Sequence, residues 1–166
     1  MRTAEEKITA REAMPGLRRQ LREAGGTLVF TNGCFDLLHV GHLRYLEFAR
    51  GQGDALCVGV NSDASVRRNK GTERPFAEEH RRAEMLAGLE CVDFVVLFEE
   101  DEPRALIEEI VPDVLVKGKD WAHYVSGREC VEAHGGRVVL ADLVEGFSTT
   151  ALIRRIRGEG NGSRAD

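Results

Sequence analysis

Two histidines three residues apart, His39 and His42, are the side chains of this sequence whose type and spacing most directly suggest chemistry. Residues three apart lie on one face of a helix, so both imidazoles would point to the same side. The free N–H groups and the dipole of a helix N-terminus favour anions. A phosphate chain would in turn favour the cationic form of each ring. The pair therefore predicts a phosphate site, although histidines at a helix start can also simply cap or pack.

The segment in front of the histidines favours the phosphate interpretation. It follows a short apolar run at residues 27–31 and contains Gly33, which lets the backbone approach a ligand closely. In open α/β sheets, ligands bind at the carboxyl ends of the strands. Cys34 in this loop is a possible reactive thiol, but a small apolar filler is the simpler interpretation.

A cationic cluster follows the next apolar run. Asn61 is followed by Arg67, Arg68 and Lys70. Arginine can hold a phosphate with two hydrogen bonds and lysine can hold it as a point charge. These side chains are candidates for a clamp on a substrate phosphate, and the alternative is a solvated polar loop.

Lys117 comes directly after another predicted strand, at residues 114–116. A lysine at a strand end faces the same crevice as the other strand ends, so we expect it to contact phosphate rather than to form an exposed ion pair. Trp121 follows shortly afterwards, and packing cover is a simpler role for it than stacking on a base.

A second turn with hydroxyl groups precedes the last predicted helix. Ser148 and Thr149 are both suited to cap that helix. A capped helix start is also an anion site, so capping and phosphate binding are compatible there.

The elements that must position these residues alternate along the chain. Apolar runs typical of buried strands alternate with helical patterns, which predicts βαβ units and a Rossmann-like, doubly wound α/β sheet of about five parallel strands with helices on both faces. Helical spacing also predicts that Tyr45, Phe48 and Ala49 share a face, that Met85 packs inward, and that Glu78 and Arg82 pair. The predicted strands are residues 27–31, 55–60, 92–98, 114–116 and 137–141, and the predicted helices are 43–50, 76–89, 103–111, 126–133 and 149–157.

The ends of the chain and its composition limit the possible functions. Residues 1–26 are expected to form an N-terminal helical extension, 27–157 the functional domain, and 158–166 a disordered tail. The net charge of −5 argues against a general nucleic-acid binder. No apolar run reaches the length of a membrane span or a secretory signal, and the four cysteines are scattered, which favours a reduced, cytoplasmic location.

The histidine loop carries a family resemblance. Residues 33–42 read Gly-Cys-Phe-Asp-Leu-Leu-His-Val-Gly-His, which resembles the G-x-F-D-x-x-H-x-G-H signature of the cytidylyltransferase-like nucleotidyltransferases. Residues 146–150 resemble the second signature of that family, with Phe147 at an isoleucine position. The resemblance implies that both histidines contact the phosphates of a nucleoside triphosphate, and that the second turn holds its β- and γ-phosphates.

The segments at residues 58–67, 115–120 and 144–150 look like the heptose 1-phosphate adenylyltransferase branch of that family. Enzymes of this branch transfer AMP from ATP to D-glycero-β-D-manno-heptose 1-phosphate, in the synthesis of lipopolysaccharide core precursors. They are often dimeric. Many are fused behind a sugar kinase, for which 166 residues leave no room. Mg²⁺ would arrive with ATP, and no metal site built by the protein alone is expected. The implied catalytic residues are His39, His42, Lys117, Ser148 and Thr149; nucleotide-binding residues add Gly33, Cys34, Phe35, Gly41, Gly118, Gly146, Phe147 and Thr150; substrate-binding residues are Asp36, Asn61, Arg67, Lys70, Asp120 and Trp121.

Three alternatives stay open. Cytidylyltransferases for glycerol phosphate and choline phosphate carry an arginine in the Arg-Thr-Glu-Gly segment before the second turn, where this chain has Leu143-Val144-Glu145-Gly146. The missing arginine counts against such a substrate and against CTP. A nucleotide-binding module without turnover and an interaction protein that reuses the fold are the alternatives from other classes.

Overall fold

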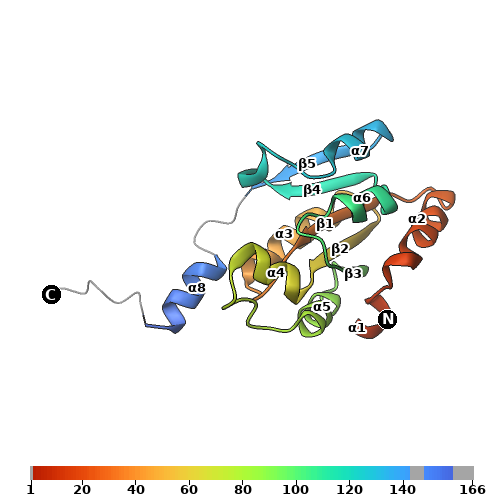
Figure 1. The fold of residues 1–166 in the computed structure, drawn as a ribbon. Helices are drawn as coiled ribbons and strands as arrows, with labels where there is room; N and C mark the ends of the chain where they lie inside the picture. Colours follow the sequence, from red (N-terminus) through yellow and green to blue (C-terminus); the bar gives the residue numbers. More distant parts are fainter. Residues whose placement is uncertain (1, 143–147, 159–166) are drawn as a thin grey trace.

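A parallel five-stranded sheet forms the centre of the molecule in the computed structural model, which describes residues 2–142 and 148–158 (Figure 1). The strand order is β3-β2-β1-β4-β5 and every pair is parallel, which confirms the predicted fold class. The strands are β1 (Leu28–Gly33), β2 (Ala55–Asn61), β3 (Phe94–Phe98), β4 (Val114–Gly118) and β5 (Arg137–Ala141).

Both faces of the sheet are covered, which explains the continuous apolar runs. Alternate residues of each strand enter two separate core clusters, so that Val29 packs on one face and Phe30 on the other. Helices α3 (Val40–Arg50) and α5 (Glu79–Ala87) cover the first face, and α2 (Met14–Glu23), α6 (Arg104–Ile110) and α7 (Arg128–Ala133) cover the second.

The N-terminal segment packs against this sheet. Helix α1 (Ala4–Lys7) leads to a parallel bridge between Ile8 and Val95, and a 3₁₀ turn, η1 (Arg11–Ala13), leads into α2. Arg18 of α2 is buried, forms an ion pair with Asp113 and donates to the carbonyl of Val111 at 3.0 Å. The predicted boundary at residue 26 stays a prediction.

Several local expectations were wrong. The cationic segment after β2 is a helix, α4 (Asp63–Lys70), because the Ser62 hydroxyl accepts from the Ser65 amide and caps it. Met85 is 63% exposed, so it does not pack inward, and Phe48, on the predicted face with Tyr45 and Ala49, is 41% exposed. The predicted pair between Glu78 and Arg82 does not form: Arg81 contacts Glu78 instead, and Arg82 is buried.

The chain adds strands on one side of β1, through β2 to β3, and then on the other side, through β4 to β5. The order of the strands therefore reverses between β1 and β4, although all strands run parallel. Their pairing covers only Val29 with Val114 and Phe30 with Leu115, although both strands continue toward their carboxyl ends. Tyr45 of α3 bridges the two strands beyond this point: its hydroxyl lies 2.7 Å from the hydroxyl of Thr31 and donates to the Val116 carbonyl at 3.1 Å. Reversal points of this kind are where open α/β sheets bind ligands.

The described ranges also bear on membrane spans and disulfides. Within them, no helix has the length and hydropathy needed to cross a bilayer. All four cysteines are free thiols.

Gly59 provides a test of the core packing. A Cβ at this position would lie 2.8 Å from the ring of Phe30, so Gly59→Ala should overpack the core and cost about 1–3 kcal/mol of unfolding free energy. Gly16, inside α2, has open space around it, and Gly16→Ala should stabilise by about 0.5–1 kcal/mol. Urea unfolding midpoints check both, and equal midpoints for the two variants would refute the packing.

Candidate active site

The loop after β1 turns sharply at Phe35. This residue has φ 46°, in the left-handed region that costs a side-chain-bearing residue of the order of 1–3 kcal/mol. Its ring is buried and folds back over Gly33, where a Cβ would lie 3.0 Å from it. The same ring meets His42 edge-on, with centroids 5.4 Å apart. The strained turn therefore sets the position of one predicted catalytic histidine.

The two histidines lie together at the start of α3, as their spacing predicts. His39 is the extended N-cap residue, and its amide donates to Nδ1 of His42 at 3.4 Å. The rings stack with centroids 3.9 Å apart. Burial lowers the pKa of His39, and burial, His39 and Lys70 together lower the pKa of His42 to about 4. Both imidazoles are therefore neutral near pH 7 in the free protein, and the predicted cationic form requires a bound anion.

Lys117 lies at the carboxyl end of β4, across the reversal point from the histidine loop. Burial lowers its pKa to about 8, against the opposing influence of Asp120, Cys34 and Glu102. The ammonium lies 5.8 Å from the ring centroid of Trp121. A half-buried amine without a carboxylate at ion-pair distance among the described residues is suited to an incoming phosphate.

Trp121 does not cover the core. It ends the 3₁₀ turn η2 (Lys119–Trp121). The residue is 51% exposed, and its ring faces His123 as well as Lys117. The exposed ring beside a strand end is available to a ligand.

The predicted substrate residues divide into two groups. Arg67 and Lys70 are exposed on α4, whereas Asn61 is buried and its amide donates to the Ser65 hydroxyl at 3.0 Å. Asp36 is also buried, with its side chain 1% exposed, because it accepts from Arg74 and from the amides of Phe76 and Ala77. Asp36 therefore organises the loop around residues 74–77, and its contact with a substrate stays a prediction.

The second turn is described only in part. Gly146 and Phe147 lie outside the described residues. Ser148 caps α8 (Thr149–Ile156), accepting from the Ala151 amide at 3.0 Å, as predicted. Thr150 lines a hollow of about 210 Å³ that Arg74 also lines, and Arg74 is bound to Asp36 of the histidine loop. Thr150 of α8 and Arg74 therefore border the same hollow, beside the histidine loop.

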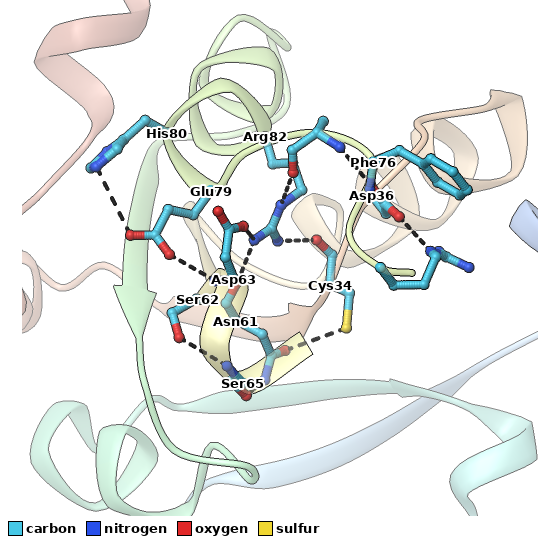
Figure 2. Close-up of polar contacts among 12 residues, drawn as sticks. Cys34, Asp36, Asn61, Ser62, Asp63, Ser65, Phe76, Glu79, His80 and Arg82 are labelled. Carbon is cyan, nitrogen blue, oxygen red and sulfur yellow. Dashed lines mark hydrogen bonds and ion pairs between the residues drawn. The ribbon is translucent and has the colours of Figure 1, made fainter. Parts of the chain in front are cut away.

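Sequence reasoning missed Arg82. Figure 2 shows its guanidinium donating to the carbonyl oxygens of Cys34 and Asn61 and pairing with Asp63. Its Nε also donates to the carbonyl oxygen of Ala77. A signal was present, because helical spacing places position 82 on the apolar face of α5 together with Leu86.

A larger hollow, of about 630 Å³, lies away from these residues, at the carboxyl end of β3. Three carboxylates line it, and its one cation, Arg11, is paired with Glu100 and Glu109. A site of this charge would repel a triphosphate, so we assign the nucleotide to the crevice between β1 and β4.

Comparison with known proteins agrees with this assignment. The family model described as cytidylyltransferase-like matches residues 30–155. Proteins named bifunctional protein HldE are 54% identical in Syntrophotalea carbinolica, over 90% of this chain, and 56% identical in Geotalea uraniireducens, over 91%. The matched region is 31% of each of those proteins, so this chain spans about a third of their length.

Two solved structures share the fold. A lipopolysaccharide core biosynthesis protein from Thermoplasma volcanium superposes with a TM-score of 0.59 at 30% identity, covering 72% of this chain and 98% of that one. Pantoate-beta-alanine ligase from Francisella tularensis gives a TM-score of 0.59 at 14% identity, over 90% and 76%, which shows likeness of fold alone. With its histidine signature at the carboxyl end of β1 and a family match over most of its length, the chain belongs to the cytidylyltransferase-like family of nucleotidyltransferases.

Proposed function

We propose that this chain transfers AMP from ATP to D-glycero-β-D-manno-heptose 1-phosphate, giving ADP-heptose and pyrophosphate for lipopolysaccharide core precursors. The observation that carries the proposal is the arrangement of His39, His42 and Lys117 around the reversal point, in a chain more than half identical to HldE proteins. The likeness to a lipopolysaccharide core biosynthesis protein supports the pathway. The same proposal includes a cytoplasmic homodimer whose ligands are ATP and a sugar phosphate, without a nucleic-acid or membrane partner.

The reaction is an in-line attack of a sugar-phosphate oxygen on the α-phosphorus of ATP. That oxygen is already an anion, so no general base is needed and the protein contributes positioning and charge stabilisation. His39 and His42 would donate to oxygens of the α- and β-phosphates, and Lys117 would neutralise charge from the β4 side. The helix start at Ser148, Thr149 and Thr150 would hold the leaving pyrophosphate.

The nucleotide loop and the α4 side have separate roles in this proposal. Backbone groups of Gly33, Cys34, Phe35, Gly41 and Gly118 would contact the nucleotide. The acceptor would lie toward Asn61, Arg67 and Lys70 of β2 and α4, and toward Asp120 and Trp121 after β4.

We propose that a magnesium ion reaches this site as part of the substrate. The described residues include no group of three histidine, cysteine, aspartate or glutamate side chains that could hold a metal ion. Mg²⁺ keeps several waters and is commonly held by phosphates, so we propose that it enters on the triphosphate, where it neutralises phosphate charge.

The test of the proposal is pyrophosphate release with Mg²⁺ in a grid of ATP or CTP against heptose 1-phosphate, glycerol 3-phosphate and choline phosphate. The proposal requires turnover with ATP and the heptose alone. Turnover with CTP and an alcohol phosphate would keep the site and replace the substrate. No pyrophosphate release with any of these substrate pairs, while the protein still binds nucleotide, would point to a non-catalytic module.

The histidines are expected to act mainly on the chemical step. His39→Ala or His42→Ala should cost about 2–4 kcal/mol of transition-state stabilisation, roughly 30- to 1,000-fold in kcat, by analogy with loss of an oxyanion donor. Steady-state kinetics measure this. His80→Ala is the control, because His80 is exposed on α5 and should leave kcat unchanged. Near-normal turnover of either site variant would refute the assigned role.

The neutral imidazole of His42 should make the free energy of unfolding depend on pH. Its pKa is about 4 in the folded protein against an ordinary value of 6.5, so the unfolded chain binds the proton more tightly. Stability is therefore fully present above pH 6.5 and declines as pH falls toward 4. Urea midpoints at pH 7 and 5 should differ less for His42→Asn than for the unmodified protein. An equal difference would contradict burial of a neutral ring.

Lys117 should give an alkaline limit to activity. With a pKa of about 8, its cation is present below that pH and is lost above it, so kcat/KM for ATP should fall through pH 8. Lys117→Arg keeps a positive charge at high pH and should remove this decline, even if its maximum rate is lower. A pH–rate profile of both proteins is the measurement, and an unchanged alkaline limit in the arginine variant would rule out Lys117 as its source.

A further inference from the structure

Arg82 is a fully buried arginine whose guanidinium contacts four acceptors on three separate segments of the chain (Figure 2). Its Nε donates to the Ala77 carbonyl at 2.9 Å, and one terminal nitrogen donates to the carbonyl of Cys34. The other terminal nitrogen contacts the Asn61 carbonyl and the Asp63 carboxylate, both at 2.8 Å. Only the planar, five-donor guanidinium can satisfy all of these acceptors at once.

The first of these contacts acts on the nucleotide loop. The Cys34 carbonyl belongs to the peptide group that enters Phe35, the residue in the left-handed region. Fixing that carbonyl fixes the turn, and the turn places the Phe35 ring against His42. Asp36 fastens the other side of the turn through Arg74 and two amides, so the loop is held from both sides.

The remaining contacts act on the side of the site that faces α4. Asn61 ends β2, and Asp63 is the first residue of the helix that carries Arg67 and Lys70. Glu79 supports the same corner, because its carboxylate accepts from the Asp63 amide at 2.7 Å. The one guanidinium thus joins the loop after β1 to the start of the helix after β2.

A charged side chain is costly at such a position. Buried ion pairs can often be replaced by apolar residues of similar volume without loss of stability, because desolvation offsets their attraction. What an apolar residue cannot do is hold three carbonyl groups of different segments in a fixed relation. The choice of arginine therefore points to geometry rather than to packing.

We propose that Arg82 is a positioning residue that fixes the histidine loop relative to the α4 side, and so aligns the two substrates for in-line attack. This inference rests on the proposed function, in which the nucleotide binds to the loop and the acceptor toward α4. Arg82 touches neither substrate. Its substitution should therefore misalign bound substrates without removing any contact to them.

The test compares Arg82→Lys with Arg81→Lys. Arg82→Lys keeps the positive charge and loses the planar guanidinium with its five donors. Arg81 is exposed and contacts only Glu78 among the described residues. We expect kcat of Arg82→Lys to fall by roughly 10- to 100-fold with KM for both substrates within about threefold, since small misplacements act on the rate. Arg81→Lys should match the unmodified protein. An unchanged kcat in folded Arg82→Lys, or a loss confined to KM, would overturn the proposal.

A second readout does not depend on turnover. Titration of His42 by NMR reports the loop directly: release of the Cys34 carbonyl should expose the imidazole and raise its pKa from about 4 toward 6.5. An unmoved titration curve would show that Arg82 does not hold the loop, even if the unmodified protein proved inactive in the substrate grid. If Arg82→Lys does not fold, Asp63→Asn weakens the ion pair between Arg82 and position 63 while keeping the side-chain volume. It should shift kcat and the titration in the same directions, and no shift would overturn the proposal.

Discussion

The reversal of strand order between β1 and β4 is the constraint on which the rest of this molecule depends. From it, the chain winds outward in both directions, and pairing of the two central strands stops after Phe30 and Leu115. No helix can cover the opening from both sides, so a crevice remains beyond the strand ends. Tyr45 closes its base with two hydrogen bonds, and burial raises the pKa of that phenol to about 12, so it remains a neutral bridge.

The groups around this crevice share one electrostatic condition. His42 and Lys117 are both desolvated, and burial lowers the pKa of each. Near pH 7 His42 is therefore neutral in the free protein while Lys117 stays largely cationic, and a triphosphate supplies the counter-charge that both cationic forms lack. Such a site binds anions without carrying permanent ion pairs that would first have to be broken. Arg82 and Asp36, by contrast, are buried charges that are paired within the protein, and each holds backbone groups in place.

Much of this was predictable from the sequence, for identifiable reasons. Strands buried on both faces give continuous apolar runs, and these predicted the parallel sheet. The histidines follow the first strand, so topology alone placed them at its carboxyl end. The resemblance to a family signature then specified the phosphate chemistry.

The errors concern side chains whose partners are distant in sequence. Arg82 was expected to pair with Glu78, its neighbour on the helix surface, because local spacing cannot reveal four acceptors contributed by two loops, a strand end and a helix start. The contacts of Asp36 with Arg74 and with amides about 40 residues away could not be predicted from the local sequence either. Buried polar groups are satisfied by the tertiary fold, and a linear pattern does not contain that information.

The most direct test of the account is a crystal structure with a non-hydrolysable ATP analogue and Mg²⁺. The account predicts the triphosphate between the carboxyl ends of β1 and β4, with α- or β-phosphate oxygens within hydrogen-bond distance of His39 and His42 and near Lys117. A nucleotide in the hollow beside Arg11 and Glu100, or one in the crevice that leaves both imidazoles without a phosphate contact, would contradict it.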